Sequence, residues 1–401
     1  MVGKRVYISG AGPVGMVVAV GLCQRGVPVT VFEAGGDVCQ DLRASYYHAP
    51  SVDMLENIGY LDKLLEGGTK DINPRFTDVA LGRQVIFDLS LLSKHYRNPY
   101  AVNAGQNWFT KVGHELLTRL DCEFLFNHRV LSATQDADQV TISVDTPNGH
   151  QKFSTDWLIA CDGGGSKIRA SQDIPFEGFT WQDRFLLIHT KHDLEPRFGR
   201  LDYRANGPQW CLVIRIPHGP GGNDWMYRVV SGLAPHEKAE NIQDPAFCQA
   251  RLQDLLPSDT AYPIDGASVY NVHQQVAQRY RKGRILLAGD AAHMNNPIGG
   301  QGLNCGIHDA FNLIEKFVPV WSGIQRTDVL DLYDRQRRLT NWEYIQKISI
   351  ENKKRNEETD LEKRAKVMDT LSQTVTDDER HRAFLHRWSM GESLEYAASI
   401  Q

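Results

Sequence analysis

Three glycines near the start of the chain have the spacing of a turn that binds phosphate groups. Gly10, Gly12 and Gly15 lie between an apolar segment, residues 5–9, and a helical segment, residues 14–25. In such a turn the first glycine permits a tight bend, the second lets the backbone approach a pyrophosphate, and the third lets helix and strand pack closely. The amino end of the helix then faces the phosphate charge. The pattern predicts a nucleotide-binding site.

Three carboxylates follow apolar segments that have the composition of buried strands. Glu33 ends residues 29–33, where a carboxylate can hold the hydroxyl pair of a ribose. Asp162 follows residues 157–161 and precedes three glycines, and Asp290 follows residues 284–288 in the segment GDAAHMNNPIGGQGLN. A surface loop that needs flexible glycines is the alternative for Asp162. Because ligands of parallel sheets bind beyond the carboxyl ends of the strands, we expect these carboxylates to share one site.

The elements that must position these residues form two kinds of pattern. The strand–helix–strand order at the start of the chain and the apolar segments at 157–161 and 284–288 indicate a parallel sheet. Between them, residues 184–232 alternate apolar and polar side chains, which indicates an antiparallel sheet in a separate layer. Helices are expected over 52–65, 108–120 and 303–317, and a charge-rich helical region begins at residue 329.

Composition excludes several classes of protein. The chain has 401 residues and a formal net charge of −5, so no basic field indicates nucleic-acid binding. No stretch approaches the roughly 18 apolar residues of a membrane span, and the first residues run directly into a strand, which leaves no room for a signal peptide. Seven dispersed cysteines without a CxxC pair indicate reduced thiols in the cytoplasm, with no disulfide framework and no metal site.

The glycine turn GAGPVG, the Asp162–Gly163 segment and the motif around Asp290, in this order and spacing, resemble the class A FAD-dependent monooxygenases. These are the p-hydroxybenzoate hydroxylase-like aromatic hydroxylases, and the resemblance covers residues from about 4 to about 350. It implies an α/β fold: a Rossmann-like FAD-binding domain, an inserted antiparallel-sheet substrate domain and a helical C-terminus. The expected boundaries are 1–75, 105–180 and 270–320 for the FAD-binding domain, 76–104 and 181–269 for the substrate domain, and 321–401 for the helical region.

The resemblance also implies a cofactor role for named residues. It places Gly10, Gly12 and Gly15 at the FAD pyrophosphate, Glu33 at the adenosine ribose, Arg43 near the pyrophosphate and the nicotinamide, Gln106 at the ribityl and adenosine region, Asp162 in the use of FAD and NAD(P)H, Asp290 at a ribityl hydroxyl, and Gly299, Gly300, Gly302, Leu303 and Asn304 around the pyrimidine end of the isoalloxazine. Taken alone, Arg43 is better explained as a surface arginine, and Gln106 alone is ambiguous. A helix amino end near the flavin would stabilise the negative charge of the reduced ring.

The implied reaction uses NADH or NADPH and O2. Reduced FAD forms a C4a-hydroperoxide, whose distal oxygen attacks an electron-rich ring carbon of a phenol, a hydroxylated aromatic acid or a hydroxypyridine. Water must be excluded, since the peroxide is otherwise lost as H2O2. Pro297 would lie beside the reacting ring.

Candidates for the substrate pocket come from the antiparallel sheet and from the loop after Arg43. The sheet offers Tyr203, Trp210, Trp225, Tyr227, His189 and Arg215, and the loop offers Tyr46, Tyr47 and His48 for a proton path from a phenol. Each has a structural alternative, because sheet aromatics are usually core residues and single basic residues are usually solvated. The same holds for His293, which lies within the cofactor motif.

Two other functions are compatible with the same motifs. One is an FAD-dependent reductase or dehydrogenase of the geranylgeranyl reductase-like type, and the other is a non-catalytic FAD-binding protein. The charged C-terminal helices leave a monomer and a homodimer both open.

Overall fold

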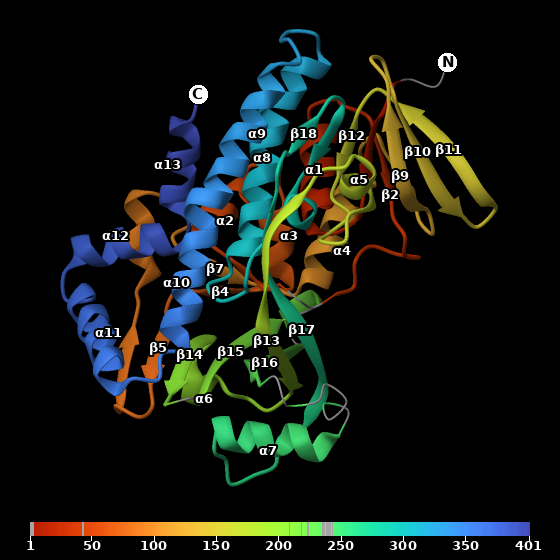
Figure 1. Ribbon diagram of the computed structural model, residues 1–401. Coiled ribbons are helices and arrows are strands. Elements are labelled where there is room, and N and C mark those ends of the chain that lie inside the picture. Colours follow the sequence, from red (N-terminus) through yellow and green to blue (C-terminus); the bar gives the residue numbers. More distant parts are fainter. Residues whose placement is uncertain are drawn as a thin grey trace.

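Two large sheets, two three-stranded sheets and a helical C-terminal region are the main parts of the molecule (Figure 1). The structure, a computed structural model, describes residues 4–41, 44–207, 209–217, 219–222, 224–234, 237, 242 and 244–401. No helix within these residues is long and apolar enough to cross a membrane.

A six-stranded sheet carries the predicted nucleotide-binding turn. Its strands, in spatial order, are β18 (Arg281–Lys282), β19 (Ile285–Leu287), β12 (Leu158–Ala160), β1 (Val6–Ser9), β2 (Val29–Phe32) and β8 (Cys122–Leu125). All neighbouring pairs are parallel except β18 and β19. The predicted strands at residues 5–9, 29–33, 157–161 and 284–288 are therefore confirmed, and their carboxyl ends lie at one edge.

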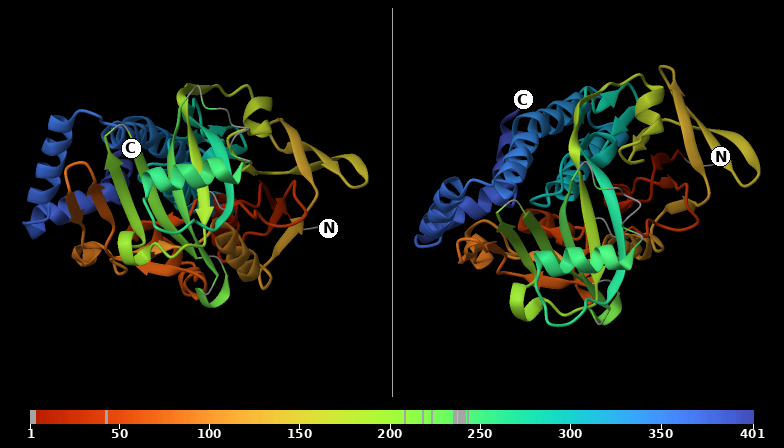
Figure 2. Two further views of the ribbon diagram at one scale, coloured as in Figure 1. Left: turned by 90° about the horizontal axis from the view of Figure 1, so that it is seen from below. Right: turned by 60° about the horizontal axis from the view of Figure 1, so that its bottom comes forward.

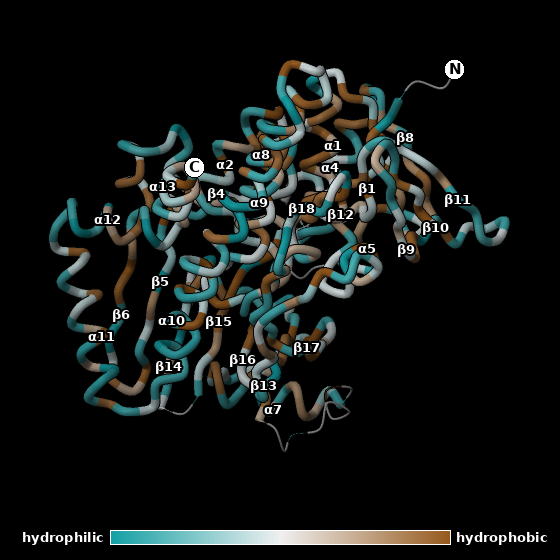
Figure 3. Tube along the Cα trace, turned by 45° about the horizontal axis from the view of Figure 1, so that its top comes forward, coloured by the Kyte–Doolittle hydropathy of each residue, from teal (hydrophilic) through white to brown (hydrophobic). Residues whose placement is uncertain are grey.

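Helix α1 (Pro13–Cys23) is buried on all sides, because it is covered by the sheet and by two further helices, α4 (Gln106–Leu117) and α8 (Gln301–Trp321). Every residue from Gly15 to Cys23 is buried. Gly21 lets α8 approach closely, since a Cβ atom there would lie 2.4 Å from the Ile314 side chain. In Figure 3 the hydrophobic colour gathers around α1 and the strands beside it.

A three-stranded sheet projects from the end of the molecule opposite the C-terminal helices (Figure 2). It consists of β9 (Arg129–Gln135), β10 (Val140–Thr146) and β11 (Gly149–Thr155). The predicted alternation in β10 is confirmed, because Val140, Ile142 and Val144 are fully buried. A second small sheet joins β3 (Tyr46–Tyr47), β7 (Ala101–Asn103) and β4 (Thr69–Asp71).

An eight-stranded sheet forms the second layer. Its strands, in spatial order, are β20 (His293–Met294), β17 (Ile264–Ala277), β13 (Phe176–Thr190), β16 (Trp225–Leu233), β15 (Gln209–Pro217), β14 (Leu201–Asn206), β5 (Arg75–Asp78) and β6 (Arg83–Ile86). All neighbouring pairs are antiparallel except β14 and β5. Helix α7 (Pro245–Leu255) covers one face of this sheet, and the other face is directed to the parallel-sheet layer.

The long strands β13 and β17 run across the expected boundaries between the two domains, at residues 180 and 270. They connect the two layers as continuous strands. The domain division proposed from the sequence stays a prediction.

The region after residue 329 is helical, as predicted. Its helices are α9 (Val329–Thr340), α10 (Gln346–Asn356), α11 (Leu361–Thr374), α12 (Asp378–Trp388) and α13 (Gly391–Ser399). A π-helical turn, Asn341–Ile345, joins α9 to α10. Helix α11 packs against β6, and its Arg364 forms a buried ion pair with Asp78 of β5, with 2.7 Å between Nη2 and Oδ1.

The predicted single helix over residues 52–65 is wrong. Two helices occupy this stretch, α2 (Ala49–Glu56) and α3 (Leu61–Glu66). Between them Gly59 has a φ of +69°, a left-handed conformation that ends α2. The apolar spacing continues across the break because both helices bury residues against one core.

Candidate active site

One large cavity joins the two layers. Its volume is about 1270 Å³, and it extends from the turns at the carboxyl edge of the parallel sheet to the face of the eight-stranded sheet that α7 does not cover. Of the residues predicted for the cofactor, those that line it are Gly10, Gly12, Glu33, Gln106, Asp162, Asp290, Pro297, Gly300, Gly302 and Leu303. The volume exceeds the ~300–1,000 Å³ of a pocket for one small ligand. It suits a dinucleotide and a substrate together.

The three glycines of the first turn have different physical roles. Gly10 has a φ of +103°, and a Cβ atom there would lie 2.4 Å from the carbonyl oxygen of Cys161. A Cβ atom at Gly15 would lie 2.0 Å from the carbonyl oxygen of Gly10. Gly12 has an extended conformation, with φ −75° and ψ 176°, and a Cβ atom there would meet nothing within 4 Å. Gly10 and Gly15 are therefore required by the fold, whereas Gly12 leaves open space in the cavity.

Two of the predicted polar residues are fixed by the backbone around the cavity. The Glu33 carboxylate accepts hydrogen bonds from the amides of Ala11 and Gly35, each at 2.8 Å. The side-chain oxygen of Gln106 accepts from the amide of Ala44 at 3.3 Å. Arg43 lies outside the described residues.

The two aspartates at the strand ends differ in environment. Asp162 uses Oδ2 to accept from the amides of Lys167 and Ile168 at 3.0 and 3.3 Å. Its Oδ1 is buried and has no partner among the described residues. Burial raises the pKa of Asp162, although hydrogen bonds from Ser166 and the following backbone oppose the shift. Asp290 is exposed and lines the cavity.

Two helices direct their amino ends at the cavity. The residues that precede α1 and α8 are Gly12 and Gly300, and neither helix has a side-chain cap or an acidic residue in its first turn. The partial positive charges of these ends are therefore not neutralised by the protein. Such ends favour a pyrophosphate and an electron-rich ring edge.

The loop before α8, residues 295–300, carries Pro297 and is held from outside the cavity by Asn304 and His48. Asn304 donates to the carbonyl oxygens of Gly300 at 2.6 Å and Tyr46 at 2.9 Å, and it accepts from the amide of His48 at 2.9 Å. His48 Nε2 lies 2.9 Å from the carbonyl oxygen of Gly299. Neither side chain lines the cavity, so both position the loop.

His48 does not lie where a proton acceptor for the substrate is needed. It is 1% exposed, and burial lowers its pKa to about 4, although the hydrogen bond to Gly299 opposes the shift. The imidazole is neutral near neutral pH, and it is separated from the cavity by the loop that it supports.

Strand alternation separates the two tyrosines before His48. Tyr46 lines the cavity and donates to Asp71 with 3.2 Å between Oη and Oδ2. Tyr47 is directed to the opposite side, where its ring stacks on Phe109 with centroids 5.0 Å apart. Tyr47 is thus a core residue and has no access to the cavity.

Alternation in the eight-stranded sheet divides the predicted substrate residues in the same way. Tyr203 and Trp210 line the cavity, together with Leu212 and Val230. Arg215, Trp225 and Tyr227 are on the other face, which α7 covers.

The residues on the α7 side have structural partners there. Arg215 pairs with Glu195 at 3.0 Å, and its guanidinium lies 5.2 Å from the centroid of the Trp225 ring. Tyr227 donates to the carbonyl oxygen of Gly199 at 3.0 Å. These three residues therefore do not belong to the cavity wall.

Arg228 is a cavity residue that the sequence reasoning missed. It is 4% exposed, lines the cavity and donates from Nε to Nε2 of His189 at 3.0 Å. Burial lowers its pKa to about 10, although the nearby Tyr270 opposes the shift. Arg228 follows Tyr227 in β16, and the two side chains are directed to opposite faces of the sheet. The sequence would have indicated Arg228 only if it had shown which face meets the cavity. The predicted His189 contacts Arg228 and is not part of the cavity wall.

Comparisons with known proteins show the family to which the chain belongs. Residues 4–348 match the family model of the FAD binding domain. The chain is 30% identical to a para-nitrophenol 4-monooxygenase from a Pseudomonas species, over 95% of this chain and 94% of the relative. It is 30% identical to the 6-hydroxy-3-succinoylpyridine 3-monooxygenase of Pseudomonas putida, over 84% of each chain. The crystal structure of a p-nitrophenol 4-monooxygenase from Pseudomonas putida superposes with a TM-score of 0.91 at 28% identity, covering 98% of each chain.

The chain belongs to the FAD-dependent aromatic monooxygenases. The predicted family, the α/β fold and FAD as the cofactor are confirmed. Because the relatives named above are all monooxygenases, the comparisons favour the oxygenase over the reductase and over the non-catalytic protein.

The cavity of this monooxygenase fits FAD on physical grounds. Gly12 leaves space for a pyrophosphate, and no side chain caps the amino ends of α1 and α8. The buried Oδ1 of Asp162 has no hydrogen-bond donor among the described residues, so a ligand hydroxyl could donate to it. When bound, FAD supplies the redox and oxygen-transfer chemistry that amino-acid side chains lack.

A buried cluster of charges supports the Asp290 loop. Asp309 of α8 accepts from the amide of Gly289 at 3.1 Å and from His293 at 2.7 Å, and its other oxygen accepts from Arg337 at 2.7 Å. The ligand atoms of His293, Cys305 and Asp309 lie within 4.8 Å of one another, a spacing that also suits a metal ion. Arg337 already supplies the positive charge there, since its Nη2 lies 3.1 Å from Cys305 Sγ. His293 is therefore a structural residue of the cofactor motif.

Gly12→Ala should separate cofactor binding from folding. We expect it to change the unfolding free energy of the FAD-free protein by less than about 0.5 kcal/mol, because its conformation and surroundings accept a Cβ atom. FAD affinity should fall at least about tenfold, because the methyl group occupies the cavity. Denaturant unfolding and a flavin-fluorescence titration measure the two effects.

Gly10→Ala is the contrasting variant and should destabilise the FAD-free protein by about 1–3 kcal/mol. Unchanged FAD affinity in Gly12→Ala would refute this assignment.

Asp309→Asn should be strongly destabilising, and the effect should depend on pH. Burial lowers the pKa of His293, but Cys305 and Asp309 outweigh it and raise the pKa well above its usual value. Burial raises the pKa of Asp309, but His293 and Arg337 outweigh it and lower the pKa. The Asp309 carboxylate stabilises the folded protein at pH values above its unfolded pKa of about 3.9. The His293 imidazolium stabilises the folded protein fully at pH values below its unfolded pKa of about 6.5.

Between those values we expect Asp309→Asn to cost about 3–5 kcal/mol of unfolding free energy. The difference in unfolding free energy between the variant and wild type should shrink as the pH rises above about 6.5. Above that pH the unfolded wild-type protein releases the proton of His293 whereas the folded protein keeps it, so wild type loses stability. Denaturant unfolding across a pH series measures it. A difference independent of pH would mean that His293 is neutral in the folded protein.

Proposed function

We propose that this monooxygenase uses NADH or NADPH and O2 to hydroxylate a small aromatic compound that carries a ring hydroxyl group. The observation that supports this most is the continuity of the cavity, in which the Pro297 loop adjoins an apolar wall that contains Tyr203 and Trp210. The names of two relatives, a p-nitrophenol and a 6-hydroxy-3-succinoylpyridine monooxygenase, add support, because both substrates have a ring hydroxyl.

The cofactor would lie along the carboxyl edge of the parallel sheet. We assign Gly10 and Gly12 to its pyrophosphate, Glu33 to the adenosine ribose, Gln106, Asp162 and Asp290 to the ribityl chain and its surroundings, and Gly300, Gly302 and Leu303 to the pyrimidine edge. The α8 amino end would stabilise negative charge at that edge. Arg43 stays a prediction, as do the cytoplasmic location and the choice between monomer and homodimer.

The wall of the eight-stranded sheet would hold the substrate ring and exclude water. Trp210, Leu212 and Val230 present apolar surface to the cavity. Exclusion of water strengthens hydrogen bonds to the substrate and protects reactive species from hydrolysis.

A route for the substrate proton would begin at Tyr203 and Tyr46, which both line the cavity. Burial raises the pKa of Tyr46, and the neighbouring Asp71 and Tyr203 raise it further. Tyr46 donates a hydrogen bond to the buried Asp71. Burial raises the pKa of Asp71, whereas Arg200 and Arg75 are among the groups that lower it. We propose that Tyr203 contacts the substrate hydroxyl and that Tyr46 and Asp71 continue the path. Asp71 has no sequence signal, because an acidic residue in a short strand is ordinarily exposed.

Tyr203→Phe should separate flavin binding from hydroxylation. The purified FAD-loaded protein is supplied with NAD(P)H and a panel of phenols and hydroxypyridines, and O2 uptake and product mass are recorded. Wild type should give a product heavier by one oxygen. Tyr203→Phe should retain FAD but lower the hydroxylation rate about 10²-fold, because a positioned proton-transfer group is lost. The matched control is Tyr227→Phe, which removes a hydroxyl that donates to Gly199 on the face of the sheet away from the cavity, and it should resemble wild type. Flavin reduction without an oxygenated product would refute the proposed function.

Arg228 would select substrates with a second, oxygen-rich substituent. A guanidinium binds the paired oxygens of a carboxylate or nitro group with two parallel hydrogen bonds. Arg228→Met should therefore raise KM at least about tenfold for 4-nitrophenol or a hydroxylated aromatic acid, and much less for phenol. Steady-state kinetics with these compounds measure the difference. Arg215→Met removes the same charge from the opposite face and serves as the control. An equal change for phenol and 4-nitrophenol would remove Arg228 from the substrate site.

A further inference from the structure

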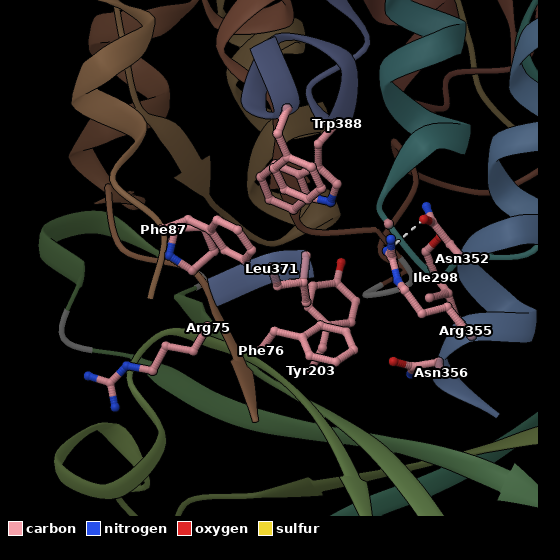
Figure 4. Close-up of a pocket in the computed structure, with 13 residues that line it drawn as sticks. Arg75, Phe76, Phe87, Tyr203, Ile298, Asn352, Arg355, Asn356, Leu371 and Trp388 are labelled. Carbon is pink, nitrogen blue, oxygen red and sulfur yellow. Dashed lines mark hydrogen bonds between the residues drawn. The ribbon is translucent and has the colours of Figure 1, made fainter. Parts of the chain in front are cut away.

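A second, small cavity lies behind the wall that contains Tyr203 (Figure 4). Its volume is about 20 Å³, enough for about one water molecule. Tyr203 and Ile298 line both this cavity and the large one, so they form the partition between the two. The remaining lining comes mainly from β5 and from helices α10, α11 and α12, including Arg355, Asn356 and Trp388.

Arg355 brings a positive charge into this enclosed space. Its Nη2 donates to Asn352 Oδ1 at 2.8 Å, and its guanidinium lies 5.7 Å from the centroid of the Phe76 ring. Its Nε is buried and has no hydrogen-bond partner among the described residues. Burial lowers the pKa of Arg355, but Tyr203 and Glu351 oppose the shift. An arginine stays charged under such conditions.

Asn352 connects this arginine to the loop that carries Pro297. Its Nδ2 donates to the carbonyl oxygen of Ile298 at 3.5 Å, and a Cβ atom at Gly299 would lie 2.5 Å from the same nitrogen. The arginine, the loop and Tyr203 are thus held in one packed unit at the boundary of the substrate chamber.

The groups around Tyr203 shift the pKa of its hydroxyl in opposite directions. Burial raises its pKa, whereas Arg355 and the Gly299 amide lower it, and Asp71 raises it again. The positive charge of Arg355, which lines the same small cavity, therefore offsets part of the cost of placing negative charge on the buried Tyr203 hydroxyl.

We propose that Arg355 is a positioning residue that stabilises negative charge shared by the Tyr203 hydroxyl and the substrate oxygen, so that the substrate binds as its phenolate. The inference rests on the proposed function and deepens it, because it names an acidic ring hydroxyl as the recognised group. A phenolate donates electrons to the ring more strongly than a phenol and so favours attack at the ortho and para carbons.

Other charged and titratable groups also face this pair. They include Arg75 on β5, which lines the same small cavity, Tyr46 on β3, Asp71 on β4, Glu351 on the same helix as Arg355, and Arg387 on α12. A variant at Arg355 leaves all of them in place, so a change in the ionisation of the bound phenol reports on Arg355 itself.

The test uses the oxidised FAD-loaded protein with 4-nitrophenol and no NAD(P)H, so that no turnover occurs. The visible absorbance of the 4-nitrophenolate gives the ionised fraction of the bound probe across a pH series. In Arg355→Met we expect the bound phenolate-to-phenol ratio at a given pH to fall at least about tenfold. Arg355→Lys should keep most of the wild-type ratio. The control is Lys354→Met, which removes an exposed charge from the same helix and should behave as wild type.

Retained FAD and an unchanged unfolding transition identify folded variants. If Arg355→Met fails this criterion, Arg355→Gln carries the same expectation because it also removes the charge. An unchanged ratio in the folded neutral variant would overturn the inference, as would a wild-type protein that does not bind 4-nitrophenol as the phenolate.

The proposed function and this inference can fail separately. Hydroxylation of phenols by wild type, with a ratio independent of Arg355, would leave the function standing and remove the inference. Binding of the phenolate that depends on Arg355, without any oxygenated product, would do the reverse.

Discussion

The site depends on the alignment of four parallel strands whose carboxyl ends meet at one edge. Backbone hydrogen bonds fix this alignment: the amide of Gly10 donates to Phe32 at 2.8 Å, that of Cys161 to Ser9 at 2.8 Å and that of Ala288 to Ala160 at 3.0 Å. Residues from positions 10, 33, 162 and 290 are thereby placed around one cavity although they are spread over most of the chain. A cofactor as long as FAD can be held only by an edge of this kind, because its adenosine and flavin ends need partners from different strands.

The second constraint is the alternation of side chains along strands. In β3 it separates Tyr46 from Tyr47, and in the eight-stranded sheet it separates Tyr203 and Trp210 from Tyr227 and Trp225. Neighbours of similar chemistry thus have different positions, one at the cavity and one in a core. The same alternation places Arg228 in the cavity and Arg215 against α7. Substitutions on the cavity face therefore change the cavity wall, whereas substitutions on the α7 face change the core beneath α7.

Buried charges connect the cofactor edge to the C-terminal helices. Asp309, His293 and Arg337 join α8, the Asp290 loop and α9, and Asn352 with Arg355 joins α10 to the Pro297 loop. Removing one member of such a group leaves an uncompensated charge in a poorly polarisable interior, which costs more than the pair itself contributes. The helical region after residue 329 is therefore part of the active-site frame.

The sequence predicts the parallel strands, the glycine turn, the carboxylates at the strand ends and the family, since each depends on local spacing or on a short motif. It does not show which side chains of a strand or loop meet the cavity, so Tyr47, His48, Arg215, Trp225 and Tyr227 were placed at the site and the cavity residue Arg228 was missed. It also extended one helix across Gly59, because apolar spacing persists where the backbone turns. The folded structure was needed for these points, because sheet register and the packing of α7 and the C-terminal helices are set by contacts between residues far apart in the chain.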